Sequence, residues 1–480
     1  MTIFTHCLAA IMAVSVQAGP EPVVPSPQQR IQESVLPAHY LEGHLNRTSI
    51  PEAMLEQDVP GVSIAFVDDG EIAWRLTFGY ADLDAAAPVT PETVFAAASL
   101  SKPVAAMTAL SLVDQGALSL DQDVNAYLDG WRLPASEFTR AEPVTLRRLI
   151  AHTAGVANHL WSAYDPGEAT PSIEAMLSGA APSVDPPVIM EAVPGERYRY
   201  SNPGYAIIQK LVQDAAGDDF QNVVERRIFG PAGMTQSAFS QPIPPALNAV
   251  AATGYSSDLE AYPDQLFPFL AAGGLWSTPS DLARFAGALM ADRETGSGRI
   301  LSASLAAEVF APSDGRLGFT RRAGPDGELL FEHWGSNAGF TSYMVGSLPH
   351  GQALVIMTNS DNGFDLMAAI ARSVAREYGW SLLEPDVHEA LDEPVPDLHR
   401  FVGAFGGAPA EGGFRIELED GALGVRSADD GAEPLTPLTP TTFIAPSQNT
   451  IYEFLESPDG AVRWVRVTRA SGYNNDFPRN

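Results

Sequence analysis

A serine stands just before a long apolar run of this chain, with a lysine three residues after it. Ser99-x-x-Lys102 leads into Pro103 and the apolar residues 104–113. An uninterrupted apolar run of this length indicates a buried helix, and proline fits its first turn, where a missing N–H costs nothing. The i, i+3 spacing places Ser99 and Lys102 on one face. The sequence therefore predicts a buried helix that presents a serine beside a lysine at its N-terminus.

The lysine stands out because the chain almost never uses one. Of 28 Lys and Arg residues, only Lys102 and Lys210 are lysines. Arginine keeps its proton in proteins and cannot act as a base, whereas a buried lysine can. The position of Lys102 thus favours an amine that must lose its proton. The alternative is that arginine is preferred throughout and a lysine fell here by chance.

Length and charge limit the possible functions. The chain has 480 residues, enough for two domains, and a net charge of -31. Nucleic-acid phosphates and anionic membrane surfaces both need basic patches, so neither partner is expected. The simplest interpretation of the acidity is solubility. No apolar run after the N-terminal region reaches the roughly 20 residues that a membrane helix needs.

The N-terminal region predicts export. Residues 1–18 carry no Lys, Arg, Asp or Glu, and they end in the small-residue pattern of a signal-peptidase site. We expect a signal peptide and a periplasmic or secreted protein; the alternative is a cytosolic protein with an apolar tail. Cys7 is the only cysteine, so disulfides and thiolate metal sites are excluded from the mature chain, and no cofactor is expected.

The remaining chain divides into two predicted domains. Residues 19–34 and 385–397 are predicted linkers, residues 35–384 a large domain and residues 398–480 a small one. In the large domain, a hairpin at 62–74 and strands at 339–347 and 353–358 enclose an α-rich stretch, 130–270. This pattern predicts an α+β fold whose sheet is built from distant segments. Short alternating strands with Gly and Asp turns predict an antiparallel sandwich or barrel after 398.

A serine hydroxyl needs a base before it can attack a carbonyl carbon. The chain has no G-x-S-x-G turn, which disfavours the α/β-hydrolase fold, and no H-E-x-x-H, which disfavours zinc peptidase chemistry. What remains is the serine–lysine pair, with a helix dipole that would favour a developing alkoxide.

The order of further motifs is specific. Ser99-x-x-Lys102 is followed by Tyr200-Ser201-Asn202 and later by His333-Trp334-Gly335. With these motifs the sequence resembles the serine β-lactamase and penicillin-binding-protein superfamily, near class C β-lactamases, D-aminopeptidases and related esterases. Three further segments are similar to that family: residues 149–155 (Leu-Ile-Ala-His-Thr-Ala-Gly), 231–234 (Pro-Ala-Gly-Met) and 272–285, which begins Ala-Gly-Gly-Leu.

The resemblance implies an antiparallel sheet flanked by helices, with an α-rich subdomain. The C-terminal segment resembles the lipocalin-like β-barrel modules that some members carry. The implied catalytic residues are Ser99 as nucleophile, with Lys102 and Tyr200 transferring protons, and either of the two could be the base. Asn202 would hydrogen-bond Lys102 and the substrate.

The resemblance also implies how the reacting oxygen is held. The backbone N–H groups of Ser99 and Ser336, beside Gly335, would form an oxyanion hole. His333 occupies the place where β-lactamases and carboxypeptidases carry a lysine that binds a substrate carboxylate. Because a neutral imidazole does this less well, the departure tilts the prediction toward esters, amides or peptides with an amino-terminal D-residue. His152 is expected to be structural, and Trp334 to line a pocket or pack in its strand.

The leading hypothesis is a serine hydrolase that forms an acyl-enzyme with a small-molecule or peptide substrate. The alternatives are a β-lactamase or D-Ala-D-Ala carboxypeptidase, a non-catalytic binding protein on the same fold, and a cell-wall-binding protein that uses its β domain. The filled motif positions argue against the non-catalytic alternative. The sequence does not predict the oligomeric state.

Overall fold

The computed structural model describes residues 25–45, 47–159, 162–311, 316–324, 326–407, 413–427, 432–470 and 472–480. The predicted signal peptide and the first part of the predicted linker therefore lie outside the described residues. Among the described residues, no helix combines the length and the apolar character needed to cross a membrane.

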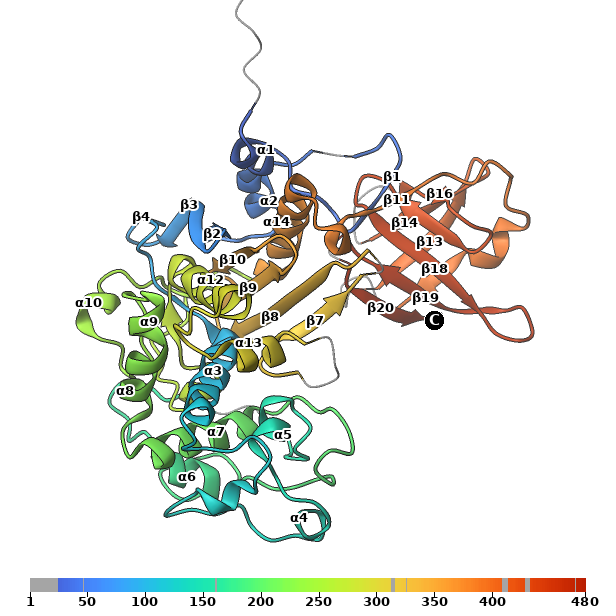
Figure 1. The fold of residues 1–480 in the computed structure, drawn as a ribbon. Helices are drawn as coiled ribbons and strands as arrows, with labels where there is room; N and C mark the ends of the chain where they lie inside the picture. Colours follow the sequence, from blue (N-terminus) through green and yellow to red (C-terminus); the bar gives the residue numbers. More distant parts are fainter. Residues whose placement is uncertain are drawn as a thin grey trace, which may run out of the picture.

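A seven-stranded antiparallel sheet forms the centre of the large domain (Figure 1), in the order β4-β3-β2-β10-β9-β8-β7. The predicted hairpin is confirmed as β2 and β3, and the two predicted strands as β9 and β10, which pair with it. The bounds are β2 Gly61–Asp68, β3 Glu71–Asp82, β4 Ala87–Pro88, β7 Thr320–Ala323, β8 Leu329–Asn337, β9 Phe340–Ser347 and β10 Gln352–Thr358. One sheet thus joins segments more than 200 residues apart, as predicted.

Helices cover both faces of this sheet because its central strands are apolar on both sides. On β2, Ala65 and Val67 join the core under α3 and α12, whereas Ile64 and Phe66 join the core under α14. The first face carries α3 (Ser101–Asp114), α12 (Pro279–Thr295) and α13 (Ala303–Val309). The second carries α1 (Pro27–Glu33), α2 (Ile50–Glu56) and α14 (Gly363–Tyr378).

The predicted α-rich stretch is confirmed as a group of short helices around α7, which packs against α3 (Figure 1). Its helices are α4 Glu137–Ala141, α5 Leu146–Ile150, α6 Ile173–Ser178, α7 Asn202–Ala216, α8 Phe220–Val224, α9 Gly230–Ala232, α10 Pro245–Asn248 and α11 Leu270–Gly273, with the single turn η3 Glu225–Phe229. The turns η1 (Ala98–Leu100) and η2 (Val124–Ala126) lie before this stretch, and η1 leads directly into α3. Short strands β5 (Phe95–Ala96) and β6 (Trp276–Ser277) pair where α3 begins.

The C-terminal segment is antiparallel β structure, but the expected closed barrel is not found. Its described strands form two sheets, β12-β13-β14-β15 and β16-β17-β18-β19-β20, around one apolar core. A single bridge between Phe405 and Arg479 is the only described pairing that connects their edges. The bounds are β12 Gly403–Phe405, β13 Phe414–Glu419, β14 Ala422–Arg426, β15 Glu433–Pro434, β16 Thr436–Pro437, β17 Thr442–Ala445, β18 Thr450–Glu456, β19 Val462–Thr468 and β20 Asn474–Pro478.

Both predicted linkers contain regular structure. Residues 27–33 form α1, which Arg30 ties to Glu377 of α14 through an ion pair. Ser26 caps the helix and forms a capping box with Gln29. The proline-rich composition of this region does not reveal this local pattern. In the second linker, β11 (Asp386–His388) pairs in parallel with β1 (His39–Leu41). The turns η4 (Ser381–Leu383) and η5 (Leu398–Phe401) flank it.

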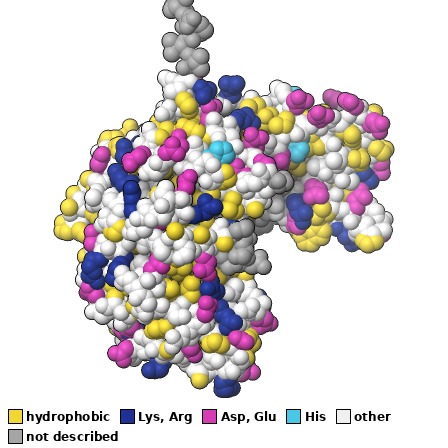
Figure 2. Space-filling view, in the orientation of Figure 1, with side chains coloured by type: hydrophobic (Ala, Val, Ile, Leu, Met, Phe, Trp, Pro, Cys, Tyr) yellow, Lys and Arg dark blue, Asp and Glu magenta, His cyan; other side chains and the backbone are white. Residues whose placement is uncertain are grey.

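Charged side chains of both signs are interspersed on the face shown in Figure 2, where Lys and Arg are scattered among Asp and Glu. This face carries no broad basic patch of the kind that nucleic acid requires.

Candidate active site

The predicted nucleophile lies where expected, at the start of the buried helix. Ser99 occupies the turn η1, and α3 follows directly from it. Ala98, immediately before Ser99, has a φ of +51°, a left-handed conformation that costs an alanine energy. Its carbonyl accepts a hydrogen bond from the Ser101 hydroxyl at 2.6 Å. The surroundings therefore hold a strained backbone at the point where the serine is presented.

Lys102 is completely buried and contacts the nucleophile. Its Nζ donates to Ser99 Oγ at 3.0 Å and to the carbonyl of Ala272 at 2.5 Å. No carboxylate is among these partners, so nothing offsets the loss of hydration of the ammonium form. Burial consequently lowers the pKa of Lys102 from its ordinary 10.5 to about 7. The amine is thus available in its neutral form near neutral pH.

Tyr200 contacts the same oxygen from another direction. Its hydroxyl donates to Ser99 Oγ at 3.0 Å. Burial raises the pKa of Tyr200 to about 12, although the hydrogen bond to Ser99 acts in the opposite sense. The phenol is therefore a proton donor at rest, and the structure brings together the three predicted catalytic side chains.

His152 positions Tyr200, in keeping with its expected structural role. The backbone N–H of Ser201 donates to His152 Nδ1 at 3.0 Å, and the two aromatic rings of His152 and Tyr200 lie 4.4 Å apart. Burial holds the pKa of His152 well below its ordinary value, so the ring stays neutral and can accept this bond. In the described residues, no group of His, Cys, Asp and Glu is suited to hold a metal ion.

Gly335 lies against the backbone of the nucleophile. A Cβ at this position would lie 3.0 Å from the Ser99 nitrogen and 2.8 Å from the Ala97 carbonyl oxygen. Neither backbone atom can move aside, so only glycine leaves the Ser99 N–H accessible. The next residue, Ser336, is exposed and pairs with Thr341 across β8 and β9. This is the place predicted for an oxyanion hole.

His333 lines the same cleft and is uncharged near neutral pH. Its Nδ1 lies 2.8 Å from the Trp334 carbonyl oxygen, which can only accept, so Nδ1 carries the proton and Nε2 is free to accept. Burial, together with the charge on Lys102, lowers the pKa of His333 to about 3. A cation at this position is therefore absent at physiological pH.

Asn202 does not make the hydrogen bond predicted for it. Among the described residues, Lys102 donates to Ser99 and Ala272, and Asn202 donates its backbone N–H to Asn158 Oδ1 at 2.9 Å. Asn202 is the first residue of α7, where Ser201 caps the helix, so backbone geometry determines its position. The Ala272 carbonyl takes the place that the motif assigns to the asparagine side chain.

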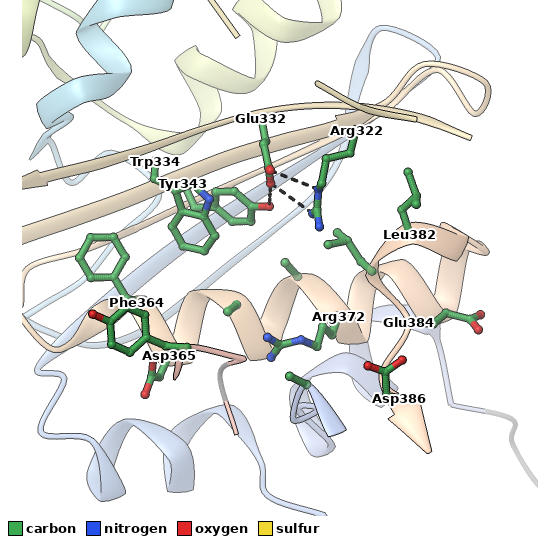
Figure 3. Close-up of a pocket in the computed structure, with 15 residues that line it drawn as sticks. Arg322, Glu332, Trp334, Tyr343, Phe364, Asp365, Arg372, Leu382, Glu384 and Asp386 are labelled. Carbon is green, nitrogen blue, oxygen red and sulfur yellow. Dashed lines mark hydrogen bonds and ion pairs between the residues drawn. The ribbon is translucent and has the colours of Figure 1, made fainter. Parts of the chain in front are cut away.

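Trp334 packs on the opposite face of the sheet from Ser99, because side chains alternate along β8. Its ring stacks on Tyr343 at 3.6 Å and lines a cavity of about 760 Å³ against α14 (Figure 3). There the Glu332 carboxylate accepts from the Tyr343 hydroxyl at 2.5 Å and from Arg322 at 3.3 Å. Ser99 does not line this polar cavity, although Glu332 and Trp334 line both it and the cleft that contains Tyr200 and His333.

The cleft beside the nucleophile has a volume of about 410 Å³, and most of the side chains that line it are aromatic or basic, with Glu332 as the acidic one. They include His152, Tyr198, Tyr200, Arg316 and His333. Four contributors were not predicted from the sequence: the Ala272 carbonyl, the Ser101 hydroxyl, Arg316, and Ser342, whose Oγ donates to the Ala97 carbonyl at 2.8 Å. Ala272 begins the segment 272–285, which is similar to a segment of the family. That similarity is the one sign in the sequence that this carbonyl belongs to the site.

Comparisons with known proteins find penicillin-binding proteins among the similar chains. The chain is 23% identical over 440 residues to penicillin-binding protein 4* of Bacillus subtilis, which covers 84% of this chain and 92% of the relative. It is 27% identical to penicillin-binding protein 4 of Amycolatopsis lactamdurans, over 74% of this chain and 96% of the relative.

Solved structures share the fold. The octameric penicillin-binding protein homologue from Pyrococcus abyssi aligns with a TM-score of 0.58 at 22% identity, covering 89% of this chain and 98% of that one. D-amino acid amidase from Ochrobactrum anthropi, in complex with D-phenylalanine, aligns with a TM-score of 0.54 at 23% identity, covering 69% and 97%. The beta-lactamase family model matches residues 42–377, which include Ser99, Lys102, Tyr200 and Gly335. The chain belongs to the beta-lactamase family.

Proposed function

We propose that the protein is a serine hydrolase that cleaves an ester or amide bond through an acyl-enzyme on Ser99. The observation that carries the proposal is the position of Ser99 Oγ, which lies 3.0 Å from both Lys102 Nζ and Tyr200 Oη. A hydroxyl held between a neutral amine and a protonated phenol has both a base and an acid within hydrogen-bond reach.

The two pKa values favour one assignment of roles. With a pKa of about 7, Lys102 accepts the Ser99 proton as Oγ attacks the carbonyl carbon. With a pKa of about 12, Tyr200 gives its proton to the leaving oxygen or nitrogen, so the acyl-enzyme is left with a protonated Lys102 and an ionised Tyr200 that can take a proton from water. Water then reaches the acyl carbon by the reverse transfers, which release the acid and restore Ser99. The negative oxygen formed in each step would lie at the Ser99 N–H, beside Gly335.

The substrate class follows from the cleft wall. Neutral His333 does not supply the cation expected of a β-lactamase or a D-Ala-D-Ala carboxypeptidase. Similarity to penicillin-binding proteins keeps those activities as the second candidate, and similarity to D-amino acid amidase supports amides of D-amino acids as substrates. The contacts among Ser99, Lys102 and Tyr200 argue against a binding protein without activity. We place the reaction in the periplasm or outside the cell, where the predicted signal peptide would direct the chain.

Labelling with a fluorophosphonate tests the proposal directly. We expect one adduct per chain by intact mass, and peptide mapping should place it on Ser99 because that hydroxyl contacts both proton-transfer groups. Protein denatured in urea before labelling is the control, since the contacts exist only in the folded state. Absence of an adduct on the folded protein, or an adduct on another serine, would reject the proposed role of Ser99.

The pH dependence of kcat/KM should report Lys102. We expect kcat/KM for an uncharged ester to rise about tenfold per pH unit below pH 7 and to level off above it, as the amine loses its proton. His333, with a pKa of about 3, does not titrate near pH 7, and burial holds the pKa of His152 well below its ordinary value. Ester hydrolysis measured from pH 5 to 9, with His333→Asn as the control, should keep the same midpoint. A midpoint that disappears in His333→Asn would assign the titration to the histidine instead.

A further inference from the structure

The active-site cleft contains a cation that the family motifs do not account for. Arg316 lines the cleft together with Tyr200 and His333. Its guanidinium carbon lies 4.3 Å from the centre of the Tyr198 ring. Among the ion pairs of the described residues, none involves Arg316, although the chain carries 59 acidic residues. Glu332 also lines the cleft, but its carboxylate pairs with Arg322 at 3.2 Å, so the positive charge of Arg316 has no ion-pair partner among the described residues.

The backbone that carries Arg316 is fixed by its neighbours. Leu317 and Phe319 are both 1% exposed, so the residues that follow Arg316 are anchored in the core. Between them, Gly318 has a φ of +88° and packs against Ala106 and Met107 of α3. The segment that follows Arg316 therefore packs on the catalytic helix α3.

A continuous row of rings connects Arg316 with the nucleophile. Tyr198 lies 6.0 Å from His152, and His152 lies 4.4 Å from Tyr200, whose hydroxyl donates to Ser99. These rings form one wall of the cleft, with the serine at one end and the arginine at the other. A substrate along this wall would meet Ser99 with its scissile carbonyl and Arg316 with a group farther along.

The stacking leaves the binding edge of the guanidinium available. A guanidinium over an aromatic ring uses its face, whereas its N–H groups point outward in the plane and match the two oxygens of a carboxylate. The contact with the Tyr198 ring thus holds the guanidinium in the cleft without a hydrogen bond that would use its N–H donors. His333 is uncharged, and Lys102 at the base of the cleft is occupied by Ser99 and Ala272.

We infer that Arg316 binds a carboxylate of the substrate and selects anionic esters or amides over neutral ones. The inference rests on the proposed hydrolase function. The substrate carboxylate would then be bound by the segment before β7, and not by strand β8, where His333 lies.

Matched esters test this selectivity. Mono-p-nitrophenyl glutarate carries a terminal carboxylate where p-nitrophenyl valerate carries a methyl group. A valerate ester of a carboxy-substituted nitrophenol places the carboxylate on the leaving group instead. The measured quantity is the selectivity, which is kcat/KM for each anionic ester divided by that for p-nitrophenyl valerate, at physiological ionic strength.

We expect Arg316→Gln to lower the selectivity for one anionic ester by roughly tenfold, mainly by raising its KM. This is the size of effect expected when one charge-assisted hydrogen bond is lost at a partly exposed site. Arg316→Lys should restore part of it, because the charge returns without the fork. Arg197→Gln is the matched control: Arg197 adjoins Tyr198, is 56% exposed and lies 3.8 Å from Glu191. It removes an equal charge and should leave the selectivity within about threefold.

The ester that responds identifies the side of the scissile bond on which the carboxylate lies, and a response of either ester supports the inference. Equal losses for all three esters, no loss, or the same loss in Arg197→Gln would overturn it. A wild-type protein that fluorophosphonate does not label would instead reject the proposed function, so the two failures are distinguishable.

Discussion

Ser99→Ala is expected to lower kcat/KM for p-nitrophenyl esters by about 10⁴-fold or more, leaving only the turnover that binding and oxyanion contacts provide. The size of the loss follows from geometry, because one oxygen accepts hydrogen bonds from both Lys102 and Tyr200. Neighbouring hydroxyls cannot replace it. Ser101 Oγ donates to the Ala98 carbonyl, and Ser201 Oγ accepts the N–H of Gly204 at 3.0 Å as the cap of α7.

The measurement is steady-state hydrolysis beside a thermal melt of each variant. Ser257→Ala, which removes an exposed hydroxyl elsewhere, serves as the matched control and should retain full activity. Because Ser99→Ala removes one hydroxyl and leaves the backbone of the turn unchanged, the variant should fold normally. A folded Ser99→Ala protein that keeps more than about a tenth of wild-type activity would exclude an acyl-enzyme on this residue.

The catalytic groups could be predicted from the sequence because each belongs to a short motif. The serine and lysine are three residues apart at a helix start, so local geometry alone brings them together. Tyr200 is about 100 residues away, and only the resemblance to a known family could connect it to Ser99. The hydrogen-bond partner of Lys102 could not be predicted in this way. A backbone carbonyl has no sequence signature, and the Ala272 carbonyl takes the place expected for Asn202.

The errors in the fold have local causes. Proline-rich composition suggested a linker before residue 35, although Ser26, Pro27 and Gln29 begin a capped helix. Alternating strands after residue 398 fit a barrel and a pair of sheets equally well, since both bury one face of every strand. Arg316 carries no pattern of its own, and its position is set by the burial of Leu317 and Phe319 and by the ring of Tyr198. Short sequence motifs cannot predict contacts between segments that lie this far apart in the chain.

Lys102→Met is expected to lower kcat/KM by about 10³-fold, because Ser99 loses its base while Tyr200 and the oxyanion contacts remain. The same substitution should stabilise the protein at acidic pH. Burial holds the pKa of Lys102 at about 7, against 10.5 for a solvated lysine. That difference corresponds to a cost of about 5 kcal/mol for the folded protein below pH 7.

The sign of the effect changes with pH. Between pH 7 and 10.5 the unfolded chain holds the Lys102 proton and the folded chain does not, so wild-type stability rises with pH. Methionine removes the cost but also the two hydrogen bonds to Ser99 and Ala272, worth about 1 kcal/mol each. We therefore expect Lys102→Met to be more stable than wild type by about 3 kcal/mol at pH 6 and less stable near pH 10. Urea unfolding at both pH values measures it.

Lys210 supplies the matched control, since it is the only other lysine and its pKa is shifted in the opposite direction. Burial acts to lower the pKa of Lys210, but Asp214 and Glu174 outweigh it and raise the pKa. Its contribution to stability is present below pH 10.5 and lost above its raised folded pKa, so Lys210→Met should destabilise the protein by about 2 kcal/mol at pH 6. Ester hydrolysis should stay within about threefold of wild type. If Lys102→Met were instead destabilised at pH 6 as Lys210→Met is, the folded protein would not lower the pKa of Lys102, which would then stay charged at neutral pH and could not serve as the base.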